Sequence, residues 1–118
     1  MSAGRDLEAV RNWVVRVVDL IGCPPARQLE YIKTERVGVD EIALQFDDVL
    51  NLVQGAVDEG SLSPEILELL LPIDSQLKEM TESKEDLWDD ESLSEASEWD
   101  ELRLAAQQAL VGFERIWE

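Results

Sequence analysis

Apolar residues recur at every third or fourth position over most of this chain, the spacing that gathers them on one face of an α-helix. The first stripe consists of Leu7, Val10, Val14, Val17, Val18 and Ile21. Its valines would also suit a β-strand, but strict alternation is absent and two arginines leave a polar face. The pattern therefore predicts a helix over about residues 5–21, ended by Gly22 and Pro24.

Two further helices are predicted before residue 60. Residues 26–36 suggest a short helix that buries Leu29 and either Ile32 or Tyr31. A longer helix is expected to begin at Asp40, whose carboxylate can accept hydrogen bonds from free backbone N–H groups, and to close at Gly60. Its stripe consists of Ile42, Phe46, Val49, Leu50, Val53 and Val57.

The next segment has a clear start signal. Ser63 is predicted to cap a helix whose first residue is Pro64. Pro72 falls inside this helix, where it removes one backbone hydrogen bond and crowds the preceding turn, so either a kink or two abutting helices are expected. The stripe keeps its register across Pro72, which favours a kinked helix; it consists of Ile66, Leu70, Ile73, Leu77 and Met80.

A last long helix is expected to begin near Ser94 or Ser97. Small residues in it, at positions 105, 106 and 109, would let a neighbouring helix approach closely. Its buried stripe consists of Trp99, Leu102, Ala106, Ala109, Leu110, Phe113 and Trp117. The whole pattern predicts an all-α, single-domain bundle over residues 1–118, with four long amphipathic helices and one or two short ones.

Charge is distributed unevenly along the chain. The formal net charge is −17, yet residues 1–36 hold six basic and five acidic groups, whereas residues 37–118 hold four basic and twenty-two acidic groups. A negative field of this size repels nucleic acid and anionic membranes and attracts basic protein surfaces. The expected partner is therefore a basic protein, with no direct contact to nucleic acid or membrane.

The acidic character culminates between Glu82 and Glu101, where ten carboxylates stand against one lysine. Trp99 lies in this tract but fits the apolar stripe of the last helix, so it is expected to pack inside. Trp88 has acids on both sides, which suits an aromatic anchor in an interface. The alternative is that Leu87 and Trp88 pack against the bundle and hold the loop in place. The candidate partner-binding residues are Glu85, Asp86, Trp88, Asp89, Asp90, Glu91, Glu95 and Glu98.

The other two tryptophans, Trp13 and Trp117, border apolar stripes and are expected to pack. Catalysis is disfavoured, because a chain without histidine lacks the usual general base, and a single cysteine, Cys23, cannot build a thiolate metal cluster. The acidic tract lacks the glycine and the alternating acids of an EF-hand loop. We therefore expect no enzymatic activity, no cofactor and no specific metal site.

No apolar run approaches the length of a membrane span, and the first ten residues lack the apolar region of a signal peptide. A single cysteine forms no internal disulfide, so the fold does not require an oxidising compartment. The expected location is the cytoplasm.

The C-terminal part of the chain contains Asp86-Leu87-Trp88-Asp89, Ser92-Leu93, Glu98-Trp99, Leu102-Arg103, Ala105-Ala106 and Ala109-Leu110. On these residues, about a quarter of the chain resembles the C-terminal part of small actinobacterial helical proteins. In size, acidity and helical character the chain is also similar to bacterial immunity proteins, which neutralise cognate toxins. The helical immunity proteins of nuclease colicins carry paired tyrosines, whereas this chain has only Tyr31, so no site residue transfers from them.

The leading hypothesis is an immunity or antitoxin-like protein that occludes a basic toxin, such as a toxin that acts on nucleic acid. A second hypothesis is an acidic DNA mimic, of the anti-restriction or anti-CRISPR kind, which would need acids along an extended face. A third is a helical scaffold whose acidic face has no role of its own. The oligomeric state is left open, although repulsion disfavours self-association through the acidic face.

Overall fold

The computed structural model describes residues 7–117, and within that range it contains six helices and no strand. The predicted all-α fold is confirmed: four helices are long, and the one or two short helices expected are two. The long helices are α1 (Leu7–Gly22), α3 (Asp40–Asp58), α4 (Pro64–Glu82) and α6 (Ser97–Ile116), and the short ones are α2 (Pro25–Glu35) and α5 (Asp90–Glu95).

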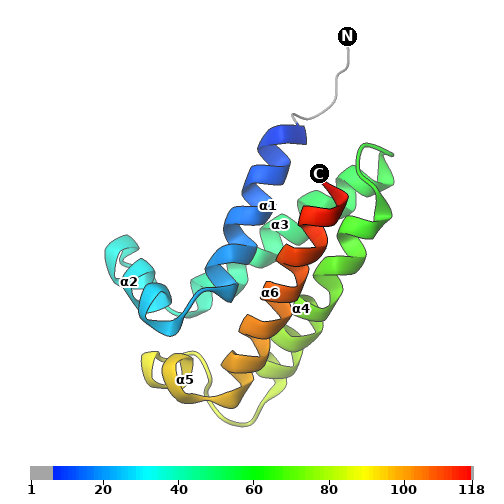
Figure 1. The fold of residues 1–118 in the computed structure, drawn as a ribbon. Helices are drawn as coiled ribbons and strands as arrows, with labels where there is room; N and C mark the ends of the chain where they lie inside the picture. The colour runs from blue at the N-terminus through cyan, green and yellow to red at the C-terminus, as the bar shows by residue number, and fades with distance from the viewer. Residues whose placement is uncertain (1–6, 118) are drawn as a thin grey trace.

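The four long helices form a bundle in which α6 packs against α1 and α4, and α3 packs against the same two helices from the other side. Their stripes meet in one core whose largest fully buried side chains include Trp99, Phe46 and Phe113. The short helices α2 and α5 lie together at one end of the bundle, while the chain's last helix ends at the other (Figure 1).

Several predicted helix ends are confirmed. Ser63 Oγ accepts a hydrogen bond from the Glu65 backbone N–H at 3.2 Å, and Gly60 follows α3 with a positive φ of 81°. Helix α4 continues without interruption through Pro72, so the segment is one helix rather than two. The expected start of α1 at residue 5 lies outside the described residues.

The structure corrects the predicted cap of α3. Asp40 is the first helical residue, Val39 precedes it, and no side chain caps the helix. The acids in the first turn, Asp40 and Glu41, therefore stand where the positive end of the helix dipole favours them.

The expected burial is right for most stripe positions and wrong for a few. In α2, Ile32 is buried whereas Leu29 and Tyr31 are half-buried, and the unpredicted Gln28 is fully buried. Trp13 is 37% exposed rather than packed, because it stands at the edge of the α1 stripe. The other predicted core positions that are only partly buried are Leu7, Leu50, Val57, Leu110 and Trp117.

The C-terminal end of α1 is held by side chains from two other helices. Gln28 Nε2 donates to the carbonyl oxygens of Leu20 at 3.0 Å and Ile21 at 2.9 Å, and Gln107 Nε2 donates to that of Gly22 at 2.9 Å. The last carbonyls of a helix have no partner within it. These glutamines therefore cap α1 and join it to α2 and α6.

Arg103 of α6 extends this arrangement into the core, where it is only 5% exposed. Its Nε donates to Gln28 Oε1 at 3.0 Å, its Nη1 to Asp100 Oδ1 at 2.9 Å, and its Nη2 to the Leu93 carbonyl oxygen of α5. Burial lowers the pKa of Arg103 below its ordinary value, and the neighbouring Asp100 opposes that shift. The Arg103 network, formed by Arg103, Gln28, Asp100 and these carbonyls, thus fixes α2 and α5 against α6.

We predict that Arg103→Met lowers the free energy of unfolding by about 3 kcal/mol, because Gln28 Oε1 and the Leu93 carbonyl lose their donor while remaining buried. Guanidinium unfolding followed by circular dichroism measures this loss. Arg16→Met, at an exposed position of α1, is the matched control and should change stability little. Equal losses from the two variants would contradict the role assigned to the network.

Candidate partner-binding surface

The segment between α4 and α6, residues 83–96, is attached to the bundle by two buried leucines, Leu87 and Leu93. The Trp99 indole Nε1 donates to the Leu87 carbonyl oxygen at 2.8 Å, inside the core. Leu93 contributes its carbonyl to Arg103. The acidic segment therefore has a defined position relative to the four long helices.

Hydrogen bonds within the segment add further order. Asp86 Oδ1 accepts from the Trp88 N–H at 2.9 Å, and Asp89 Oδ1 accepts from the Ser92 N–H at 2.7 Å, which caps α5. Ser92 Oγ also donates to the Asp86 carbonyl oxygen at 3.1 Å. Two of the predicted partner-binding acids, Asp86 and Asp89, thus already use one carboxylate oxygen to hold the backbone.

The two tryptophans of the acidic tract have different environments. Trp99 is fully buried, which confirms its predicted place in the core. Trp88 is half-buried and packs against the Trp99 ring edge to face, with centroids 5.7 Å apart and an interplanar angle of 78°. Leu87 packs in the core and holds the loop against the bundle, which is one of the two alternatives that the sequence left open. Trp88 packs against Trp99 and also keeps part of its surface in solvent.

The predicted acids are mostly accessible. Of the seven, six are exposed: Glu85, Asp86, Asp89, Asp90, Glu91 and Glu95. Glu98 is half-buried at the start of α6, where its backbone carbonyl accepts from Gln76 Nε2 of α4 at 3.1 Å. Within the predicted set, the accessible carboxylates therefore belong to the connecting loop and α5 rather than to α6.

An open groove of about 510 Å³ lies between α2 and α5. Leu29, Ile32 and Val37 give it an apolar lining, and Asp90 and Glu91 contribute carboxylates from α5. Lys33 and Ser94 complete the lining. The sequence did not indicate this groove, because its two sides are about sixty residues apart and meet only through tertiary packing.

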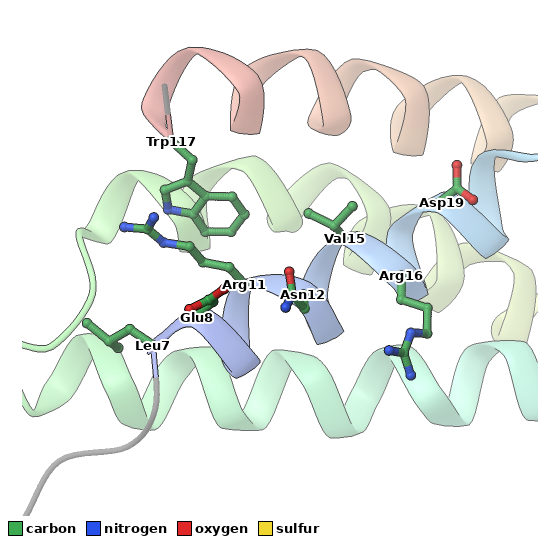
Figure 2. Close-up of a pocket in the computed structure, with 8 residues that line it drawn as sticks. All are labelled: Leu7, Glu8, Arg11, Asn12, Val15, Arg16, Asp19 and Trp117. Carbon is green, nitrogen blue, oxygen red and sulfur yellow. The ribbon is translucent and has the colours of Figure 1, made fainter.

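A second open pocket, of about 830 Å³, lies over α1 and contains none of the predicted partner-binding residues (Figure 2). The Arg11 guanidinium lies over the Trp117 ring, 5.3 Å from its centroid, and Trp117 stacks on Phe113. Trp117 therefore packs against neighbouring side chains, although it is only partly buried. The lining is Leu7, Glu8, Arg11, Asn12, Val15, Arg16, Asp19 and Trp117, which mixes both charges in a wide, shallow surface.

No family model, curated protein or solved structure matches the chain. Within residues 7–117, no group of three or more Asp, Glu or Cys side chains is arranged to hold a metal ion. None of the described helices has both the length and the apolar character needed to cross a membrane. The groove between α2 and α5 and the acids beside it are the feature from which a function can be inferred.

We predict that the cap of α5 titrates at unusually low pH. Hydrogen bonds from Ser92 lower the pKa of Asp89 below its ordinary 3.8, because they favour the charged carboxylate. Because the pKa of Asp89 is lower in the folded protein than in the unfolded chain, its ionised carboxylate stabilises the folded state fully above pH 3.8. This stabilisation is lost as the pH falls through the pKa that Asp89 has in the folded protein. The backbone amide resonance of Ser92, followed by NMR, should therefore shift with a midpoint below 3.8.

The matched control is Asp89→Asn, which keeps an oxygen acceptor at the cap but cannot titrate. In this variant the Ser92 resonance should lose its acid transition. A Ser92 midpoint at or above 3.8 in the unmodified chain would contradict the prediction.

Proposed function

We propose that the chain is an immunity or antitoxin-like inhibitor that binds a basic toxin through the α2–α5 groove and the exposed acids around it. The observation that carries the proposal is the combination in this groove of an apolar lining with the carboxylates of Asp90 and Glu91. Inhibition is stoichiometric: the bound inhibitor covers the toxin's working surface.

The groove suits a lysine or arginine side chain of the toxin. The aliphatic part of such a side chain can pack on Leu29, Ile32 and Val37, while its charged end pairs with the carboxylates of α5. A toxin that acts on nucleic acid needs cationic groups to hold phosphates. A surface that captures those groups blocks the toxin's access to its substrate.

Charge and apolar contact have separate tasks in this proposal. The net charge of −17 raises the rate of encounter with a basic protein, an effect that salt weakens. Buried aromatic and aliphatic contacts determine mainly how long the complex lasts. Trp88, which keeps part of its surface in solvent beside this end of the bundle, is the aromatic side chain suited to that second task.

We predict that neutralising α5 weakens binding to the cognate toxin, which is to be sought first in the reading frame next to that of this chain. The variant Asp90→Asn, Glu91→Gln, Glu95→Gln removes three exposed carboxylates, and calorimetry with the purified toxin should show a loss of affinity of about tenfold to a hundredfold. Trp88→Ala, tested separately, should mainly raise the dissociation rate.

The matched control is Asp47→Asn, Asp48→Asn, Glu68→Gln, which removes the same charge from exposed positions on α3 and α4. Its affinity should stay within a fewfold of the original. Equal losses in both triple variants would overturn the assigned site and favour a DNA mimic, since mimicry uses acids spread along an extended face. Failure of the unmodified chain to bind or neutralise the toxin would favour the scaffold hypothesis.

We also predict a substitution with the opposite effect. Lys33 lines the same groove and repels an incoming cation, so Lys33→Gln should strengthen toxin binding by a few fold. Lys84→Gln makes the same chemical change in the acidic tract but outside the groove, and it should improve binding less. An equal gain from both would show that only net charge matters and that the groove has no special role.

A further inference from the structure

A smaller cavity, of about 300 Å³, lies where α1, α2 and α3 meet. Its lining carries two arginines, Arg16 of α1 and Arg27 of α2, against one carboxylate, that of Asp19. Leu20, Cys23, Tyr31 and Gln45 complete the lining. In a chain whose net charge is −17, this cavity is therefore a local site of net positive charge.

The two arginines are only weakly neutralised by their surroundings. Asp19 Oδ2 lies 3.9 Å from Arg27 Nη2, which is too far for a hydrogen bond. The Arg16 side chain extends away from Trp117 and α6 (Figure 2), and it forms no ion pair within residues 7–117. The guanidinium donors of both arginines are therefore free to bind a ligand.

Tyr31 and Cys23 add a donor and no negative charge. Gln45 Nε2 donates a hydrogen bond to the Tyr31 hydroxyl oxygen, so the hydroxyl hydrogen of Tyr31 is left to donate to a ligand. The buried Cys23 thiol donates to the Leu20 carbonyl oxygen at 3.1 Å. Burial raises the pKa of this thiol above its ordinary value, so it stays uncharged near neutral pH and does not repel an anion.

We propose that this cavity binds the phosphate group of a small molecule. One guanidinium group already engages both oxygens of a carboxylate through two parallel hydrogen bonds. Arg16 and Arg27, which come from different helices, together with the Tyr31 hydroxyl offer more donors than a carboxylate can accept. They match the larger number of oxygen acceptors on a phosphate.

The net charge of −17 opposes the approach of any anion, but it acts on this cavity mainly from a distance. Salt at physiological concentration screens exposed charges beyond about 8 Å. Every lining residue except Gln45 belongs to residues 1–36, which hold six basic and five acidic groups. Because both arginines are exposed, binding should be weak, with a Kd on the order of 1 mM.

An NMR titration of the full chain with inorganic phosphate tests the proposal. The ionic strength is held constant with chloride, and the side-chain amide resonances of Gln45 report on the cavity. We predict a saturable shift, with acetate at least about tenfold weaker than phosphate, because acetate offers fewer acceptors. Acetate that binds as tightly as phosphate, or a shift that does not saturate, would overturn the proposal.

Variants locate the binding groups. Arg16→Met and Arg27→Met should each weaken phosphate binding by at least about tenfold, since each removes one guanidinium fork from the cavity. The matched control is Arg115→Met, which removes the same charge from an exposed position of α6 outside the cavity. Equal losses from Arg115→Met and Arg16→Met would show that only net charge matters and would overturn the site.

Phenyl phosphate distinguishes two sources of the phosphate group. Tighter binding than that of inorganic phosphate would identify an organic phosphate, whose carbon atoms can pack on Leu20. Equal binding of the two would identify free phosphate as the ligand. The cavity shares no residue with the α2–α5 groove, and its titration uses no toxin, so either proposal can fail while the other stands.

Discussion

The placement of the two short helices depends on one buried arginine. A guanidinium removed from water costs several kcal/mol unless its donors are all paired, and Arg103 finds its acceptors on three different elements. Gln28 of α2, Leu93 of α5 and Asp100 of α6 must therefore meet at one place. A helix of only six residues, such as α5, has little stability of its own, so this meeting point gives it a fixed position.

That constraint supports the proposed function, because it orders the acidic surface before any partner arrives. The segment is held by Leu87 and Leu93 in the core and by the aspartate caps at Trp88 and Ser92. Binding then costs less conformational entropy than it would for a disordered acidic tail. The same order makes the acids unequal, since Asp86 and Asp89 bond their own backbone whereas Asp90 and Glu91 line the groove.

Local patterns in the sequence were sufficient to predict the long helices, and tertiary pairing explains what they could not predict. Period-3.6 stripes placed α1, α3, α4 and α6, and Ser63 marked a helix start because its cap is local. Local patterns did not indicate that Gln28 and Arg103 are buried, since the hydrogen bond between them joins positions seventy-five residues apart. Asp40 misled by one position, because a first-turn acid and a capping acid look alike in sequence.

The folded molecule also changes the meaning of the uneven charge. Along the chain, a nearly neutral first third precedes a strongly acidic remainder, which suggests a simple attraction to any basic protein. In space, α2 of the first third lies against α5 of the acidic tract, so Lys33 shares a groove with Asp90 and Glu91. A well-matched partner must present a cation near the carboxylates and none near Lys33. Net charge alone would attract every basic protein, and this mixed lining is a physical basis for selecting among them.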